Sequence, residues 1–168
     1  GTTGLVYENL YHYYPRKGKM QPWLAKSGDW VEDNVYKLKL REGAEWTDGE
    51  NLTAEDVKYT FELGKDQPVG WAPIWEQLEE INIISDTELN FVFTEGKVPY
   101  QNWKLLRYDT PIVPKHIWKE IPNKMDVAND NPVGSGPYVS HRAAEDRMVW
   151  ARNNDWWGND VFGQPSPK

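Results

Sequence analysis

The feature that most constrains this fold is residues 46–57, where a strand exit, a tight turn and a helix start follow one another without a spacer. Asp48-Gly49 is a turn signal, because glycine accepts positive φ and an aspartate side chain can close the turn on the backbone. Thr53 stands where a helix N-cap belongs, and Asp56, three residues later, can complete a capping box with it. These residues therefore predict a strand, a chain reversal, and a helix that begins at Ala54.

The segments around this stretch predict short strands and short helices. Residues 35–41 alternate apolar and basic side chains, which is typical of a half-buried strand, and residues 54–64 form a helix that ends at Gly64. The other expected elements are a helix or helix end at 5–14, a hairpin of strands at 81–84 and 88–93, helices at 99–108 and 114–120, a second hairpin at 138–141 and 148–152, and a frayed tail at 162–168. The order predicts an α+β fold, a small mixed sheet of antiparallel hairpins with a few helices.

Composition and charge exclude several classes of protein. The 168 residues include no cysteine, so the chain has neither a disulfide framework nor a thiolate metal site nor a cysteine nucleophile. A net charge of -7 and a pI near 5.0 argue against a nucleic-acid partner, which needs clustered cations. No apolar run approaches the length of a membrane span, and the first residues lack the pattern of a signal peptide. We therefore expect a cytosolic chain or one whose leader has been removed.

Aromatic residues are unusually frequent for so hydrophilic a chain. Ten tryptophans and nine tyrosines accompany a mean hydropathy of -0.79. Some of these rings must pack inside, but the excess indicates that several lie at a surface covered by a ligand or a partner lobe. Indole rings suit sugars, since the CH face of a pyranose stacks on them while neighbouring polar groups bond its hydroxyls.

The residues that could support catalysis or bind a metal do not form a recognised site. His12, His116 and His141 lie on three expected elements without metal-ligand spacing. Ser135 lies between glycines but lacks the spacing of a nucleophile elbow. Adjacent acids such as Glu79-Glu80 are more often solvated than set across a sugar as a glycosidase pair. We therefore expect a protein that is not an enzyme and has no cofactor or metal.

Five motifs follow one another along residues 5–158. They are LVYENL at 5–10, QPWLAKSGDW at 21–30, LKLREGAEW at 38–46 continued by DG at 48–49 and LTAEDV at 52–57, VGSGPY at 133–138, and NNDWWG at 153–158. They resemble the patterns LYE-x-L, P-x-LA-x-x-W, F-x-LR-x-G-x-x-W/F-x-DG-x-x-LTA-x-DV, xG-T-GPY and N-x-x-YWG of extracellular solute-binding proteins of ABC importers, family 5, the dipeptide/oligopeptide-binding type. One spacing differs, because residues 28–30 carry an extra residue relative to the family.

The resemblance implies a fragment of the first lobe of such a protein, whose members close two lobes around a ligand. Residues 1–132 would form the small subdomain of a periplasmic-binding-protein-like type II lobe, and residues 133–168 the truncated start of its main-sheet part. The missing second lobe and an ABC permease would be partners, and the bare lobe surface could self-associate. The location implied is periplasmic or extracellular, with the leader absent.

Three tryptophans are the expected ligand-binding residues. Trp71 lies between Gly70 and Pro73, where the family often directs an aromatic residue toward the ligand cleft, and Trp75 follows one turn later. Trp103 is expected on the next helix and would line the same cleft. The structural alternatives stay open: Trp71 caps the core, Trp75 packs under the loop, and Trp103 packs inside.

Other tryptophans are expected to be structural. Trp23, Trp30 and Trp46 belong to framework segments, whereas Trp156 and Trp157 form an aromatic pair that has lost its cover. The aromatic excess favours a β-linked oligosaccharide as the imported ligand. The alternatives are an oligopeptide-binding protein of the same family, a stand-alone carbohydrate-binding module, and a unit that serves only folding or interaction.

Overall fold

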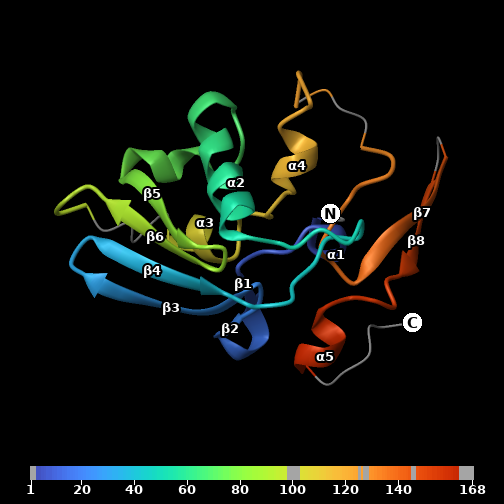
Figure 1. Ribbon diagram of the computed structural model, residues 1–168, viewed down its shortest axis with the longest axis horizontal. Coiled ribbons are helices and arrows are strands. Elements are labelled where there is room, and N and C mark those ends of the chain that lie inside the picture. The colour runs from blue at the N-terminus through green and yellow to red at the C-terminus, as the bar shows by residue number, and fades with distance from the viewer. Residues whose placement is uncertain (1–2, 98–102, 125, 127–128, 145–146, 163–168) are drawn as a thin grey trace. The chain divides into compact units, whose positions relative to one another are not determined.

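The structure is a computed structural model that describes residues 3–97, 103–124, 126, 129–144 and 147–162 (Figure 1). It divides into two compact units. The sheet unit comprises Asn9–Glu42 and Thr53–Ile112, and the terminal unit comprises Gly1–Glu8, Gly43–Leu52 and Val113–Lys168. Both contain short helices and antiparallel strands, which confirms the predicted α+β class. The division expected at residue 133 stays a prediction.

The sheet unit is built on four antiparallel strands in the order β3-β4-β6-β5. They are β3 (Ala25–Glu32), β4 (Val35–Leu40), β5 (Leu78–Ser85) and β6 (Glu88–Phe93). Tyr36 is paired with Phe91 and Leu38 with Leu89, so alternate side chains of β4 and β6 share one buried face. The period-2 pattern of residues 35–41 and the hairpin at 81–93 are thereby confirmed.

The helix α2 (Ala54–Asp66) lies against this sheet, with Phe61 edge-on to Phe91 at 5.1 Å between ring centroids (Figure 1). Its start is as predicted: the amide of Thr53 donates to Asp56 Oδ2 at 2.9 Å, which is one half of a capping box. Its end is not, because the helix continues past Gly64 to Asp66. Gly64 is buried inside α2, where a Cβ would lie only 3.0 Å from Ala72 Cα. The glycine is needed for close packing and not for a C-cap.

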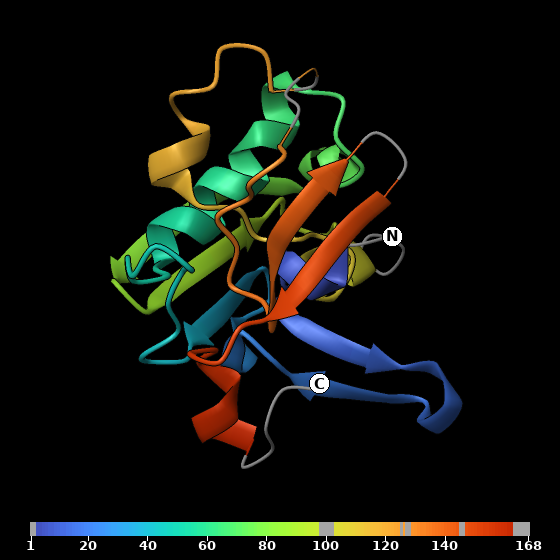
Figure 2. The same ribbon diagram turned by 90° about the vertical axis from the view of Figure 1, so that its right-hand side faces the viewer.

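The N-terminal part of the sheet unit differs most from expectation. The helix or helix end predicted for residues 5–14 is wrong beyond Val6. The helix α1, in the terminal unit, covers only Thr3–Val6, and β1 (Tyr11–Tyr14) pairs with β2 (Lys19–Pro22) through the 3-10 turn η1 (Pro15–Lys17). Consecutive aromatic side chains lose rotamer freedom in a helix and pack better across a hairpin. Figure 2 shows this hairpin extending away from the four-stranded sheet.

Two further elements complete the sheet unit. The short helix η2 (Ala72–Glu76) follows α2, and α3 (Trp103–Arg107) follows β6. The first residues of the helix expected at 99–108 lie outside the described residues. β3 was not predicted, because its polar and glycine-containing sequence lacks apolar alternation. It forms as an edge strand by pairing with β4.

The terminal unit contains α1, α4 (Lys115–Trp118), the hairpin β7 (Tyr138–Ala144) with β8 (Arg147–Arg152), and α5 (Gly158–Phe162). The second hairpin and the helix after Pro114 are confirmed, whereas α5 was not predicted. The tight turn is also confirmed: Gly49 has φ 90° and its amide donates to the Trp46 carbonyl at 3.0 Å. The tail from residue 163 lies outside the described residues.

Candidate ligand-binding site

Trp71 immediately precedes the short helix η2, Trp75 lies within it, and both indoles are anchored to α2. Trp71 Nε1 donates to the Thr60 carbonyl at 2.8 Å, and Trp75 Nε1 donates to the Phe61 carbonyl at 2.7 Å. The two acceptors are successive carbonyls of one helix, so both indoles are held against the same stretch of backbone. Both rings remain half-exposed. Their polar N–H groups are therefore satisfied while part of each ring faces solvent.

Gly64 allows this anchoring. A Cβ at Gly64 would approach the backbone of Ala72 and lie 3.3 Å from Trp75 Cδ1. Any larger residue would push η2 away from α2, because the contact on the far side is backbone and not a flexible side-chain end. The small residue thus brings the two indoles within hydrogen-bonding reach of α2.

The two rings differ in what covers them. Lys65 Nζ lies 4.0 Å from the ring centroid of Trp75, a cation–π distance. Among the residues that the structure describes, no ring or cation packs on Trp71. Trp71 is therefore the better placed of the two for stacking with a ligand.

Trp103 lies in an aromatic cluster on α3 and not on η2. Its ring stacks on Trp30 at 5.5 Å with an interplanar angle of 19°, and it meets Tyr36 edge-on at 4.9 Å. The Arg107 guanidinium lies 5.3 Å from its centroid. The structure thus brings Trp71 and Trp75 together on η2 and assigns Trp103 to a second group of rings.

Trp30 is the exposed member of that second group. Its side chain is 40% exposed although it contacts Trp103, Phe93 and Tyr36. It was expected to be a structural framework residue. The signal that could have revealed it is an aromatic residue within the polar stretch Asp29-Trp30-Val31-Glu32-Asp33-Asn34.

An open depression adjoins Trp30 at the end of the β3–β4 hairpin. It has a volume of about 390 Å³ and is lined by Trp30, Val31, Glu32 and Asp33. A second one of about 620 Å³ shares Glu32 and Asp33 and adds Asn34, Glu95 and Gly96. An exposed ring beside carboxylates offers both a stacking surface and hydrogen-bond acceptors, the two kinds of group that a sugar uses.

Two tyrosine hydroxyls form a hydrogen bond next to this aromatic cluster. The hydroxyls of Tyr11 and Tyr36 form a hydrogen bond with 2.9 Å between their oxygens. Gly28 packs against both hydroxyls, and a Cβ at this position would overlap them. Burial is the main reason why the pKa of each phenol is raised above its ordinary value. The hydroxyls therefore stay protonated and bonded to each other across neutral pH.

The prediction that Trp156 and Trp157 form an uncovered aromatic pair is wrong. Trp156 and Trp157 are buried and have not lost their cover. Trp156 Nε1 donates to Glu8 Oε1 at 3.1 Å and Trp157 Nε1 to Glu8 Oε2 at 2.8 Å. This is a buried structural network, and we assign it no ligand.

The histidines do not gather at a metal site. Within the described residues, no three His, Cys, Asp or Glu side chains are placed to hold a metal ion. His116 instead bonds Asp48, with Nε2 at 2.8 Å from Oδ2. Burial raises the pKa of the Asp48 carboxyl, but the hydrogen bonds from His116 and the Glu50 amide and the charge of His116 together outweigh burial, so the pKa lies below its usual value. In the part of the chain that the structure describes, no helix has the length and apolar character to span a bilayer.

Comparison with known proteins identifies the family. Residues 19–168 match the model of bacterial extracellular solute-binding proteins, family 5 Middle. An oligopeptide-binding protein of a Thermotoga maritima ABC transporter, solved with bound mannohexaose, is 45% identical with a TM-score of 0.89, over 98% of this chain and 31% of that one.

Other relatives agree with this match. AppA from Bacillus subtilis, solved with a nonapeptide, is 25% identical with a TM-score of 0.77, over 92% of this chain and 32% of that one. The peptidoglycan-binding protein YepA of Agrobacterium fabrum is 32% identical over 147 residues, 84% of this chain and 23% of YepA. The chain thus spans a third or less of these relatives. It belongs to the family of bacterial extracellular solute-binding proteins, family 5.

Proposed function

We propose that this chain is part of the solute-binding component of an ABC importer, and that it contributes aromatic surface to the binding of a β-linked oligosaccharide. The observation that carries the proposal is the pair of half-exposed indoles on η2, whose N–H groups are already bonded to α2. A ring held in this way loses little freedom when a ligand stacks on it. The mannohexaose bound to the Thermotoga maritima relative supports a sugar ligand.

The roles of the individual rings follow from what covers each one. Trp71 stacks directly on a pyranose face. Trp75 supports it and presents its ring edge, because Lys65 covers part of that ring. Trp103 acts through Trp30, which it holds in place at the depression that Trp30 lines at the end of the β3–β4 hairpin. A β-linked chain exposes flat pyranose faces along an extended ribbon, which suits rings spread over a surface.

The partners in this proposal are those of an importer. An ABC permease receives the ligand, a second lobe closes over it, and the protein works in the periplasm or outside the cell. The family consists of solute-binding proteins, and we propose no catalytic residue. Closure of two lobes on the ligand would convert binding into a signal for the permease.

An oligopeptide is the second candidate ligand. It is favoured by the nonapeptide in the Bacillus subtilis relative, since an extended peptide also needs aromatic surface for its side chains. A stand-alone carbohydrate-binding module is the third candidate, and it differs in that this chain alone would bind with full affinity.

Calorimetric titration of the chain with mannohexaose, cellohexaose and a nonapeptide separates these candidates. We expect weak binding of at least one hexasaccharide and none of the peptide. Replacing Trp71 with alanine should weaken sugar binding roughly 2- to 10-fold, the equivalent of about 0.5–1.5 kcal/mol for one aromatic contact.

The matched control is Trp118→Ala, which removes a half-exposed indole from the terminal unit, where the ring meets Tyr7 edge-on. It should leave sugar binding unchanged. If the chain binds the nonapeptide and neither hexasaccharide, the ligand is an oligopeptide and not a sugar. Tight binding of a sugar by this chain would favour the stand-alone carbohydrate-binding module. Equal losses in the Trp71 and Trp118 variants would contradict the role of Trp71.

A further inference from the structure

The β1–β2 hairpin concentrates positive charge on an otherwise acidic chain. Residues 9–28 contain no aspartate or glutamate, although the chain as a whole carries a net charge of -7. The cations of this stretch are Arg16, Lys17, Lys19 and Lys26, and the first three lie at the hairpin tip. We call Pro15 to Lys19 the basic tip. Its charge has the opposite sign to that of the whole chain.

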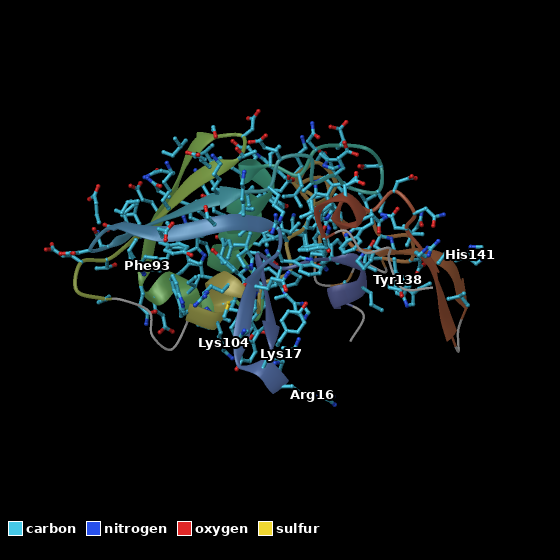
Figure 3. The ribbon with its side chains drawn as sticks, turned by 90° about the horizontal axis from the view of Figure 1, so that it is seen from below. Arg16, Lys17, Phe93, Lys104, Tyr138 and His141 are labelled. Atoms are coloured by element: carbon cyan, nitrogen blue, oxygen red, sulfur yellow. The ribbon has the colours of Figure 1, made fainter. Side chains whose placement is uncertain are left out.

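The basic tip has a defined shape. The turn η1 is closed by the Gly18 amide, which donates to the Pro15 carbonyl at 3.3 Å, and Gly18 takes the left-handed conformation with φ 56°. The strands are held in register next to it, with Tyr14 paired to Lys19. Figure 3 shows Arg16 at the outer end of the hairpin, with Lys17 beside it. The tip therefore presents its cations at a convex end.

The cations of the basic tip are exposed and available. Arg16, Lys17 and Lys19 are all exposed, and none of the ion pairs formed by the described residues includes them. By contrast, Lys37 and Lys39 both pair with Glu88 on the sheet. The positive potential of the tip is thus not cancelled by a neighbouring carboxylate.

An aromatic row lies directly behind these cations. His12 and Tyr14 share one face of β1, with ring centroids 4.4 Å apart, and Trp23 lies 5.4 Å from His12. Burial lowers the pKa of His12, so at neutral pH the ring acts as an aromatic group and not as a charge. Tyrosine and tryptophan are enriched at membrane interfaces, where one end of the ring is apolar and the other wet.

The opposite face of β1 fixes the hairpin to the rest of the sheet unit. Tyr13 stacks on Tyr108 at 5.1 Å with an interplanar angle of 22°. The hairpin is therefore a braced projection, and its tip meets a partner without first having to order.

We propose that the basic tip and the aromatic row behind it form a contact site for the anionic phospholipid headgroups of a bilayer surface. Because the tip is convex, its unpaired cations fit a broad negative surface better than they fit a pocket of a partner. The aromatic rings lie along one side of the hairpin and reach the headgroup layer together with the cations when the hairpin lies along the bilayer surface. Such a contact would hold a solute-binding protein at the membrane where a permease lies, and it does not depend on the ligand.

Vesicle sedimentation tests this site with the chain itself. We expect the chain to bind vesicles of phosphatidylcholine mixed with phosphatidylglycerol, to bind pure phosphatidylcholine much less, and to dissociate at high salt. The triple variant Arg16→Gln, Lys17→Gln, Lys19→Gln should lower partitioning roughly 100-fold, since each cation near an anionic surface contributes roughly a fivefold factor.

The matched control removes three exposed or half-exposed cations from other elements, Lys58→Gln, Lys97→Gln and Lys119→Gln, and changes the net charge by the same amount. It should bind as the unchanged chain does. Equal losses in both triple variants would show that net charge alone matters and would overturn the site. Absence of binding to the anionic vesicles would also overturn it and would favour an acidic protein partner for the tip. Circular dichroism verifies that each variant is folded.

Discussion

At the scale of single residues, Glu8 joins parts of the terminal unit that lie far apart in the sequence. Its carboxylate is only 3% exposed, and each of its oxygens accepts an indole N–H, one from Trp156 and one from Trp157. Trp157 also donates to the Ser135 carbonyl at 3.1 Å. A carboxylate suits this position because it accepts on both oxygens, whereas an amide accepts on only one.

The variant Glu8→Gln tests this network. The glutamine NH2 group would face one of the indole N–H groups and would itself be a buried donor without an acceptor, even if Trp157 kept its bond to the Ser135 carbonyl. We expect the free energy of unfolding to fall by about 1–3 kcal/mol, the cost of an unsatisfied buried group. Urea denaturation measures the change. Glu120→Gln is the control, since the side chain of Glu120 is 75% exposed and its pair with Lys119 is a surface one. A loss in the control equal to that of Glu8→Gln would contradict the argument.

At the scale of elements, the packing of η2 on α2 determines how Trp71 and Trp75 are presented. Gly64 makes that packing close, and the two indole hydrogen bonds then lock it. In an isolated helix, alanine would be preferred to glycine by about 1 kcal/mol. Here the methyl group would meet the backbone of Ala72, and that contact outweighs the helix preference.

The variant Gly64→Ala should therefore be destabilised despite its better helix propensity. We expect the overpacking cost of about 1–3 kcal/mol to exceed the propensity gain of about 1 kcal/mol. Thermal unfolding measures the balance, and a change in tryptophan fluorescence reports the displaced indoles. Gly70→Ala is the control, because a Cβ there meets nothing within 4 Å and its φ is not positive. If Gly64→Ala were as stable as Gly70→Ala, η2 would not depend on the glycine.

At the scale of the whole molecule, the terminal unit is assembled from three separate parts of the chain. Thr47 donates its amide to the Gly134 carbonyl at 2.9 Å, and Gly136 donates to the Val6 carbonyl at 2.8 Å. Gly134 and Gly136 each leave no room for a Cβ, because the backbone of α1 lies against them. The segment from residue 133 onward is thus needed to complete a unit that begins at the N-terminus.

A chain that ends at residue 132 should lose this unit while keeping the sheet unit. We expect the amide signals of β4 and β6 to persist in an NMR spectrum, and those of residues 43–52 to collapse toward unfolded positions, because their partners after residue 133 are gone. The full 168-residue chain provides the reference spectrum. Unchanged signals for residues 43–52 would show that residues 1–132 fold independently, in line with the proposed division at residue 133.

The sequence by itself determined the elements whose cause is local. The Asp48-Gly49 turn, the helix start at Ala54 and the alternation of β4 follow from side chains within a few residues of each other, and they also carried the family resemblance. Alternation and helix caps depend on residues that are close together in the sequence, so they can be recognised without the tertiary structure.

Only the tertiary structure decided the features whose partners are distant in sequence. β3 exists because β4 lies beside it, Gly64 is constrained by Ala72, and Trp156 and Trp157 are buried because Glu8 accepts their N–H groups. The same holds for Trp30 and Trp103. Trp30 on β3 is exposed and its ring stacks on Trp103 of α3, and the spacing of these residues in the sequence does not reveal this contact. Whether a ring is buried depends on the residues that pack on it, and these residues come from distant parts of the chain that only the tertiary structure brings together.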